Sequence, residues 1–457
     1  MKMKMPHTLT LLFYLMVAAL IATWIIPQGQ FDIEIVNDRE VVIPGTFEVS
    51  EERTFMNPVN LFIAVPRAFE DAQAIIFFLF IIGGVLAVIR KTGTIDALLG
   101  RLLENLGGRP GTLIFITVFV FALASSVMGA SAEYIPFVLI LAALCRTMKM
   151  DTMTAVGMIV AGYGIGYGAA AFNQYTIVVA QGVADLPTYS GWPVRMVLLV
   201  PFVMIGAHHV WSYAVMVQEN PATSLMAGLE PPLEEETEND YPALTISHVI
   251  IIVSFFLALG IAVWGIATRG WYLYELGAAF LILGIFSAVI GKISPSLMAS
   301  EFVEGAKGLT ETALLVGIAR GIALIMEDGQ ILHSIVHAMS VPLSYVGPEL
   351  ASVGMMLLQT IMNFFVTSGS GQAFLTMPLM APLGDILGVT RQVAVQAYLY
   401  GDGFANMIVP TNPVLMGILG MASVPYNKWF RFCLPLILKL LAFAAICMVG
   451  MVMFGFS

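Results

Sequence analysis

Residues 351–387 read ASVGMMLLQTIMNFFVTSGSGQAFLTMPLMAPLGDIL, an apolar stretch that is interrupted halfway by Thr367-Ser368-Gly369-Ser370-Gly371. The stretch is too long for a single crossing of a bilayer, for which about 20 residues suffice. Because small polar residues rather than a charged loop interrupt it, a hairpin that enters the membrane and returns to the same side fits better than two crossings. The backbone polar groups of such a bend are tolerated only where protein buries them or where they line a wet cavity.

The first half of the chain contains the same arrangement. Residues 112–144 form a second long apolar stretch, which Ser-Ser-Val-Met-Gly-Ala-Ser interrupts at residues 125–131. Each hairpin precedes a glycine-rich span, and residues 162–164 with Asn173 match residues 401–403 with Asn412. An odd number of expected spans separates the starts of the two copies, so the copies should have opposite orientations in the membrane. Inverted repeats of this kind indicate alternating access around a site near the bilayer midplane.

The composition of the whole chain is that of a membrane protein. Of its 457 residues, 59% are hydrophobic and 11% are charged, and the mean hydropathy is +0.89. So few charges could not cover the apolar surface of a soluble protein, so lipid must surround much of the chain. We expect an all-α polytopic membrane protein with about nine transmembrane helices plus two re-entrant hairpins. The distribution of Lys and Arg favours an N-terminus inside and a C-terminus outside, and nothing is basic enough to bind nucleic acid.

The two glycine-rich spans contain residues that break helices. Thr152–Val183 has four alternating glycines between positions 162 and 168, and Val393–Leu419 has Gly401, Gly403, Pro410 and Pro413. Proline removes a backbone hydrogen bond and clashes with the preceding turn. We therefore expect both helices to unwind at these positions, although the glycines could instead serve close helix packing.

Unwound helices provide the groups that a transporter needs. Half-helix N-termini offer N–H groups to an anionic solute, and freed carbonyls and hydroxyls can bind Na+. We predict Na+ binding at Ser126, Asn173, Ser370 and Asp402. The predicted substrate-binding and ion-binding residues are Ser125, Ser126, Gly129, Ser131, Glu133, Gly164, Asn173, Thr367, Ser368, Gly369, Ser370, Gly371, Asp402, Asn406, Thr411 and Asn412.

Charges at membrane depth are costly, each by roughly 2.5 to 3.5 kcal/mol on insertion scales. Asp402 lies within the second expected break, and Glu133 follows the first hairpin tip. They could couple transport to Na+ or H+, neutralise a cationic group on the substrate, or form a buried ion pair with Arg320. Arg320 itself could be structural or could bind a substrate carboxylate. We predict no catalytic residue, and no cofactor besides the coupling ion.

Several motifs resemble those of one transporter family. The segments Asn363-Phe-Phe-Val-Thr-Ser-Gly-Ser-Gly-Gln-Ala, Leu375-Thr-Met-Pro-Leu and Gly401-Asp-Gly-Phe are similar to the YfcC family, relatives of the anaerobic C4-dicarboxylate carrier DcuC. The resemblance implies the ion transporter superfamily, whose members are homodimers in which a transport domain moves like an elevator against a scaffold. It implies scaffold segments at residues 1–110 and 218–346, and transport-domain segments at residues 111–217 and 347–457. At the first tip the sequence departs from the acidic pair expected in close relatives, because it reads Ala132-Glu133.

The expected function is secondary active transport, either Na+-coupled or by exchange, in the bacterial cytoplasmic (inner) membrane. The solutes would be small and carboxylate-bearing, either C4-dicarboxylates or amino acids, including basic ones such as arginine and ornithine. Glu133 and Asp402 outnumber the one arginine near membrane depth, which favours a substrate with a cationic group. A passive channel is the alternative, and an intramembrane enzyme would need a second catalytic group that the sequence does not offer.

Overall fold

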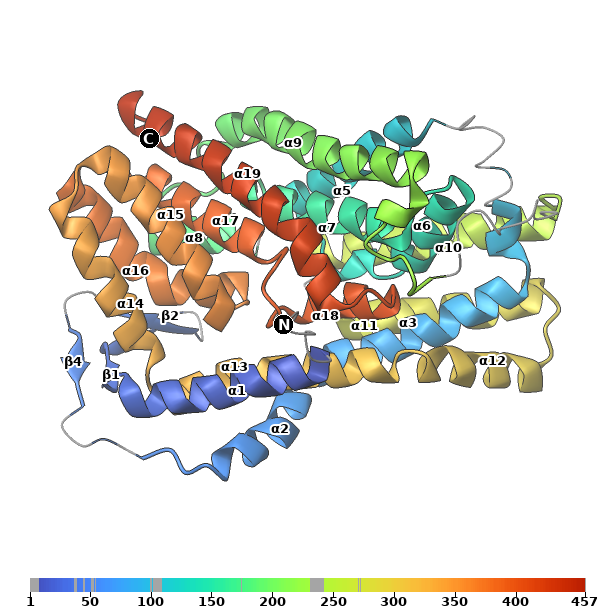
Figure 1. The fold of residues 1–457 in the computed structure, drawn as a ribbon, viewed down its shortest axis with the longest axis horizontal. Helices are drawn as coiled ribbons and strands as arrows, with labels where there is room; N and C mark the ends of the chain where they lie inside the picture. The colour runs from blue at the N-terminus through green and yellow to red at the C-terminus, as the bar shows by residue number, and fades with distance from the viewer. Residues whose placement is uncertain are drawn as a thin grey trace.

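The computed structural model is a mostly helical protein, and it describes residues 8–36, 39–43, 46–50, 53, 55–98, 101, 109–173, 175–230, 242–269, 271 and 273–456 (Figure 1). The helices of the first half, with two short 3-10 helices, are α1 (Thr8–Ile25), α2 (Asn60–Asp71), α3 (Gln73–Lys91), α5 (Pro110–Met128), η1 (Ala132–Tyr134), α6 (Phe137–Thr147), α7 (Thr152–Gly168), α8 (Ile177–Val183), α9 (Trp192–Glu219) and η2 (Pro221–Thr223). Those of the second half are α10 (Ile246–Arg269), α11 (Leu273–Ile290), α12 (Pro295–Lys307), α13 (Thr310–Asp328), α14 (Leu332–Ser340), η3 (Val341–Tyr345), α15 (Pro348–Phe365), α16 (Gly369–Leu387), α17 (Arg391–Ala405), α18 (Pro413–Met421) and α19 (Tyr426–Met453).

Four short strands modify the all-α expectation. The strands β1 (Gly29–Gln30) and β4 (Glu48–Val49) pair antiparallel, and so do β2 (Ile33–Val36) and β3 (Arg39–Val42). They lie in the polar loop between α1 and α2, and β3 packs against α16. The strands are thus a small addition to a helical fold.

Five of the described helices, α3, α5, α9, α11 and α19, are long and apolar enough to cross a membrane. The other expected spans fall on helices that are shorter, that include residues of uncertain placement, or that are interrupted, as α7 and α8 are. The count of about nine spans therefore stays a prediction.

Both hairpins have the expected order of helix, break and helix. In the first, α5 ends at Met128 and is followed by Gly129, whose φ of 74° lies in the left-handed region that glycine adopts without strain. In the second, α15 ends at Phe365 and α16 begins at Gly369, with the Ser368 side chain accepting a hydrogen bond from the Gly371 N–H at 3.3 Å. The side of the membrane to which each hairpin returns stays a prediction.

Both glycine-rich spans are interrupted: the break predicted at Pro410 and Pro413 lies there, whereas the breaks predicted at the glycines were wrong. Helix α7 runs unbroken through Gly162, Gly164 and Gly166, and α17 runs unbroken through Gly401 and Gly403. The chain leaves helical geometry only afterwards, between α7 and α8 and between α17 and α18; Pro410 lies in the second gap, and Pro413 is the first residue of α18.

The glycines instead allow α7 and α17 to cross closely. A methyl group added at Gly403 would lie 2.5 Å from the Cα atom of Gly168, and one at Gly164 would lie 3.2 Å from the Gly403 carbonyl oxygen. Small residues let helix backbones approach in this way. The alternative reading of the glycines, close packing, was therefore the correct one.

Replacing Gly403 by alanine should destabilise the protein, because the new methyl group would meet backbone atoms that cannot rotate away. Overpacking of this kind costs about 1–3 kcal/mol, so the thermal unfolding temperature of the purified protein in detergent should fall. Gly450→Ala on α19 is the control, since no atom lies within 4 Å of the added carbon and alanine is the better helix former. Equal unfolding temperatures for the two variants would contradict the packing argument.

The two repeats interlock around α7 and α17. Helices α5, α6 and α9 surround α7, while α15, α16 and α19 surround α17, and α7 contacts α17 directly. Each repeat also reaches across to the other, since α8 packs on α16 and α18 packs on α6. A second group of helices, α1, α2, α3, α11, α12 and α13, lies together along one side of the molecule (Figure 1) and meets the first group where α13 contacts α18.

Candidate functional site

A cavity of about 660 Å³ lies where the hairpin tips, the two breaks and the second group of helices converge. Ten of the sixteen predicted site residues line it: Gly129, Ser131, Glu133, Thr367, Ser368, Gly369, Ser370, Gly371, Asn406 and Asn412. The other six are Ser125, Ser126, Gly164, Asn173, Asp402 and Thr411, and they do not line it. The sequence analysis thus identified residues that the fold brings to one cavity together with residues that support its wall.

Ser125 and Ser126 hold the first tip in shape. The Ser125 hydroxyl donates to the Ala130 carbonyl oxygen at 2.6 Å. The Ser126 hydroxyl donates to the Ala169 carbonyl oxygen at 2.7 Å, and the Ser126 carbonyl oxygen accepts from three successive N–H groups of residues 171–173 at 3.0–3.1 Å. These bonds attach the first tip to the break after α7.

The same attachment continues through Asn173. Its side-chain amide donates to the Ser125 carbonyl oxygen at 3.4 Å, and its side-chain oxygen accepts from the Tyr175 N–H at 2.9 Å. Gly129 faces this amide so closely that a Cβ atom there would lie 2.6 Å from the Asn173 side-chain oxygen. The turn at the first tip therefore requires glycine for space as well as for its backbone conformation.

Glu133 presents an acidic group to the cavity beside the first tip. The residue is 6% exposed, and its carboxylate accepts a hydrogen bond from the Ser131 N–H at 2.7 Å. Across the tip, the Tyr167 hydroxyl donates to the Gly129 carbonyl oxygen at 2.6 Å. Sequence analysis missed Tyr167 and its neighbours Tyr163 and Tyr175, which also line the cavity.

A line of amide and carboxylate side chains supports the second break. One oxygen of Asp402, Oδ1, accepts from the side-chain amides of Asn363 at 2.9 Å and Asn406 at 3.1 Å. Asn406 in turn accepts from the Asn412 amide at 2.8 Å, and the Asn412 side-chain oxygen caps α18 by accepting from the Val414 N–H at 2.9 Å. Thr411 ties the break to the hairpin, because its hydroxyl donates to the Phe364 carbonyl oxygen at 2.8 Å.

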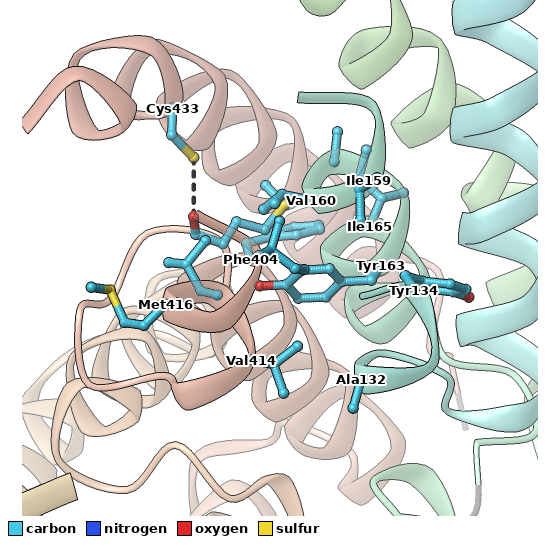
Figure 2. Close-up of a cluster of buried hydrophobic side chains, with 14 of the residues drawn as sticks. Ala132, Tyr134, Ile159, Val160, Tyr163, Ile165, Phe404, Val414, Met416 and Cys433 are labelled. Carbon is cyan, nitrogen blue, oxygen red and sulfur yellow. Dashed lines mark hydrogen bonds between the residues drawn. The ribbon is translucent and has the colours of Figure 1, made fainter. Parts of the chain in front are cut away.

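The two repeats meet in an apolar wall around Tyr163. Figure 2 shows this ring among Ala132 of the first tip, Val414 at the start of α18, and Phe404 of α17. The Tyr163 hydroxyl donates to the Asn406 carbonyl oxygen at 2.8 Å, so one repeat fixes the break of the other. Such a wall gives the cavity one apolar face and fixes the polar groups on either side of it.

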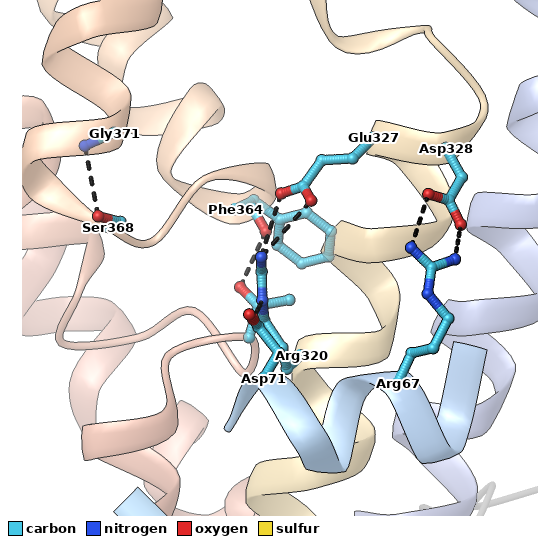
Figure 3. Close-up of polar contacts among 9 residues, drawn as sticks. Arg67, Asp71, Arg320, Glu327, Asp328, Phe364, Ser368 and Gly371 are labelled. Atoms are coloured by element: carbon cyan, nitrogen blue, oxygen red, sulfur yellow. Dashed lines mark hydrogen bonds and ion pairs between the residues drawn. The ribbon is translucent and has the colours of Figure 1, made fainter. Parts of the chain in front are cut away.

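Another part of the cavity wall carries an ionic cluster, which excludes one of the alternatives left open for Arg320. This arginine pairs with Asp71 of α2 and with Glu327 of its own helix at 3.1 Å, rather than with Asp402 or Glu133. Figure 3 shows it between the two carboxylates, with a neighbouring pair of Arg67 and Asp328. The earlier expectation failed because Asp71 approaches across 249 positions of sequence.

The charges on the cavity wall favour a cation. Asp71, Glu133 and Glu327 face one arginine, Arg320, which is already paired with two of them. The predicted Na+ ligands are divided between the tips: Ser126 and Asn173 belong to the first cluster, and Ser370 and Asp402 to the second. Among the described residues, no group of three or more His, Cys, Asp or Glu side chains is placed to hold a metal ion.

Comparisons with known proteins extend over almost the whole chain. Residues 5–453 match the family DcuC, described as C4-dicarboxylate anaerobic carrier. A protein of Escherichia coli that is provisionally named basic amino acid antiporter YfcC is 30% identical, with 99% of this chain and 97% of the relative covered. A Haemophilus influenzae protein without an assigned function is 25% identical over 97% of this chain and 96% of the relative.

Two solved transporter structures align loosely with the fold. The YdaH transporter of Alcanivorax borkumensis aligns with a TM-score of 0.43 at 15% identity over 99% of each chain. MtrF of Neisseria gonorrhoeae, from a class of antimetabolite efflux pumps, aligns with a TM-score of 0.44 at 18% identity over 98% of this chain and 95% of MtrF. The family match and the identity to the Escherichia coli relative carry the assignment: the chain belongs to the DcuC family of C4-dicarboxylate anaerobic carriers.

Proposed function

We propose that the protein is a secondary active transporter that exchanges small amino acids bearing a cationic group. The observation that carries the proposal is the charge of the cavity, where three carboxylates face one arginine that is already paired. A C4-dicarboxylate, which the family description names, would bring two more negative charges into a cavity whose carboxylates already outnumber its arginine. The provisional name of the Escherichia coli relative supports the same class of solute.

A basic amino acid has complementary groups in the cavity. Its carboxylate would lie at the N-terminus of α16, where Ser370 and Gly371 line the cavity and the helix dipole favours negative charge. Its cationic end would lie toward Glu133 or toward Asp71, where carboxylates form charge-assisted hydrogen bonds. Apolar contact would come from Tyr163 and Val414 between the two ends.

We infer an elevator mechanism from the composition of the cavity wall. Residues of the proposed transport domain (111–217 and 347–457) form most of it, while Asp71, Leu273, Arg320 and Glu327 belong to the proposed scaffold (1–110 and 218–346). A solute between two such bodies would move with one past the other. We place the protein as a homodimer in the bacterial cytoplasmic membrane, with its N-terminus inside and its C-terminus outside.

The function is tested by counterflow in proteoliposomes. Vesicles loaded with arginine, ornithine, a neutral amino acid, succinate or nothing should be compared for uptake of labelled arginine. We expect saturable uptake driven by the basic amino acids. Uptake of labelled succinate driven by internal succinate, with no arginine exchange, would contradict the charge argument in favour of dicarboxylates. Unsaturable flux that is independent of the internal solute would instead identify a channel.

Replacing Glu133 by glutamine should weaken binding of arginine much more than binding of citrulline, its uncharged analogue. A hydrogen bond to a charged group contributes about 1.5–3 kcal/mol, or roughly a tenfold to hundredfold change in the half-saturation constant. The two constants are measured by inhibition of labelled exchange. Glu304→Gln is the control, since that carboxylate forms an exposed pair with Lys307 on α12. Equal losses for arginine and citrulline would remove Glu133 from the cation site.

A further inference from the structure

Three buried side-chain oxygens behind the second tip have no hydrogen-bond partner. They are Asp402 Oδ2, Asn363 Oδ1 and Thr176 Oγ1. All three residues are fully buried, with 0% of their surface exposed. Leaving a buried acceptor unsatisfied costs about 1–3 kcal/mol, and more where the group is charged. Three such oxygens, one of them on a carboxylate, therefore call for a specific explanation.

The hydrogen bonds around Asp402 fix which atoms remain. Asn363 donates its amide to Asp402 Oδ1 at 2.9 Å and to the Gln372 side-chain oxygen at 3.2 Å. Two acceptors on one side of the amide place its nitrogen there and leave its own oxygen unpaired. Asn406 donates to the same oxygen of Asp402 at 3.1 Å. Both amides thus orient the carboxylate and leave Oδ2 available.

Thr176 is a residue of the first repeat that lies close to Asp402 at the second tip. It is the residue before α8, where a threonine hydroxyl commonly caps the helix, yet here it makes no capping bond. A Cβ atom on Gly369 would lie 2.8 Å from Thr176 Cγ2 and 3.4 Å from Asp402 Oδ2. Threonine and aspartate therefore flank the same glycine at the second tip, one from each repeat.

The chemistry of these atoms selects the occupant. They are all oxygens and carry one negative charge, and among the described ion pairs none involves Asp402. Calcium takes six to eight oxygen ligands and several carboxylates, which this set does not supply. A proton would satisfy one or two of the oxygens, whereas a small monovalent cation can satisfy all three. We propose that Thr176, Asn363 and Asp402 bind a Na+ ion between the two repeats.

This inference rests on the proposed function and deepens it, because it names the coupling ion and a route for its effect. Bound Na+ would draw Thr176 and the start of α8 toward Asp402 of α17, beside the Gly369 end of the second tip. Gly369 also lines the solute cavity. Occupancy of the cation site would therefore order the tip that we expect to receive the substrate carboxylate.

The first test measures binding without transport. The full-length protein in detergent is unfolded by heat in increasing NaCl, KCl or choline chloride at constant ionic strength and pH. A ligand that binds only the folded state stabilises it in a saturable way, so we expect a saturable rise of the unfolding temperature with Na+. No Na+-specific rise would overturn the proposal. It would also be overturned if lowering the pH in choline chloride reproduced the whole effect.

Variants then locate the site. Thr176→Val removes the hydroxyl but keeps the shape, and it should raise the dissociation constant for Na+ by at least about tenfold, as the loss of groups around metal sites commonly does. Ser287→Ala on α11 is the matched control, because that hydroxyl is also buried without a partner. If Thr176→Val keeps the Na+ response of the unaltered protein, the site is misplaced.

Asp402→Asn gives a second, opposite signature. The asparagine oxygen can accept from Asn363 and Asn406 as before, while its NH2 group can fill the position of the cation. We therefore expect a folded variant whose stability in choline chloride equals or exceeds that of the unaltered protein and no longer depends on Na+. A retained Na+ response in this variant would contradict the proposal.

Exchange measurements separate this inference from the proposed function. Arginine exchange with the same salt on both sides reports solute transport alone. If exchange occurs while no variant changes Na+ binding, the cation site is wrong and the transporter assignment stands. If Na+ binds as proposed while no solute exchanges, the proposed function is wrong and the cation site stands.

Discussion

Replacing Asn412 by alanine should abolish solute exchange. The Asn412 side chain joins two structures at once: its amide donates to Asn406 at 2.8 Å, and its oxygen caps α18 through the Val414 N–H at 2.9 Å. Losing the cap costs about 1 kcal/mol, and leaving Asn406 without its donor adds about 1–3 kcal/mol. The destabilised groups lie in the wall of the cavity. We therefore expect solute exchange to be lost while the protein remains folded.

The measurement compares labelled arginine exchange with thermal unfolding. We expect exchange to fall by at least about thirtyfold, since the summed penalty is about 2–4 kcal/mol and each 1.36 kcal/mol is a factor of ten, while the variant remains folded at assay temperature. Ser294→Ala is the control for cap loss alone, because Ser294 caps α12, away from the cavity, through the Leu297 N–H. Normal exchange in Asn412→Ala would show that the second break does not shape the solute site.

The position of the hairpins could be predicted from sequence because the signal is local. A run of small polar residues interrupts each long apolar stretch, and the structure places the turns within these runs, at Gly129 and Ser368. Each half of the sequence has a hairpin followed by a glycine-rich span, and this shared order predicted that each tip is paired with a break. Ten predicted residues reach one cavity because the fold follows that local order.

The role of the glycines could not be predicted in the same way. Glycine permits both unwinding and close packing, and the choice depends on a neighbour that the local sequence does not contain. Gly403 lies against the backbone at Gly168, and Gly401 lies against Gln359 and Thr360 of α15. Both helices therefore continue through their glycines. The chain leaves helical geometry after Gly168 in the first repeat and after Ala405, before Pro410, in the second.

The ionic wall and the unpartnered oxygens were also beyond sequence reasoning. Asp71 and Arg320 come from helices far apart in the chain, and nothing near either residue names its partner. Thr176 received no role in the sequence analysis, and only the structure shows that its hydroxyl lies buried before α8 without a capping bond. Asn363 was part of a recognised motif but received no role, since only its distance to Asp402 assigns one.

Replacing Arg320 by glutamine should change the selectivity of the cavity by about fivefold. The variant leaves Asp71 and Glu327 in the wall without their cation, so the cavity gains a negative charge. At an effective dielectric constant near 20, charges a few ångströms apart interact by up to about 4 kcal/mol. The side chains of Arg320, Asp71 and Glu327 are 29%, 49% and 37% exposed, so water screens the interaction to the order of 1 kcal/mol.

The ratio of the inhibition constants of citrulline and arginine measures this change, because the two solutes differ chiefly in charge. If Arg320 occupies the carboxylates that would otherwise bind the cationic end of the substrate, its loss frees these carboxylates for arginine. The inhibition constant of citrulline divided by that of arginine should then rise. If Arg320 instead binds the substrate carboxylate, both solutes should weaken equally and the ratio should stay the same. Arg67→Gln is the matched control, since it breaks the neighbouring pair with Asp328 and neither residue lines the cavity. An unchanged ratio in Arg320→Gln, with both affinities reduced, would therefore assign this arginine to the carboxylate and reverse the orientation that we propose for the solute.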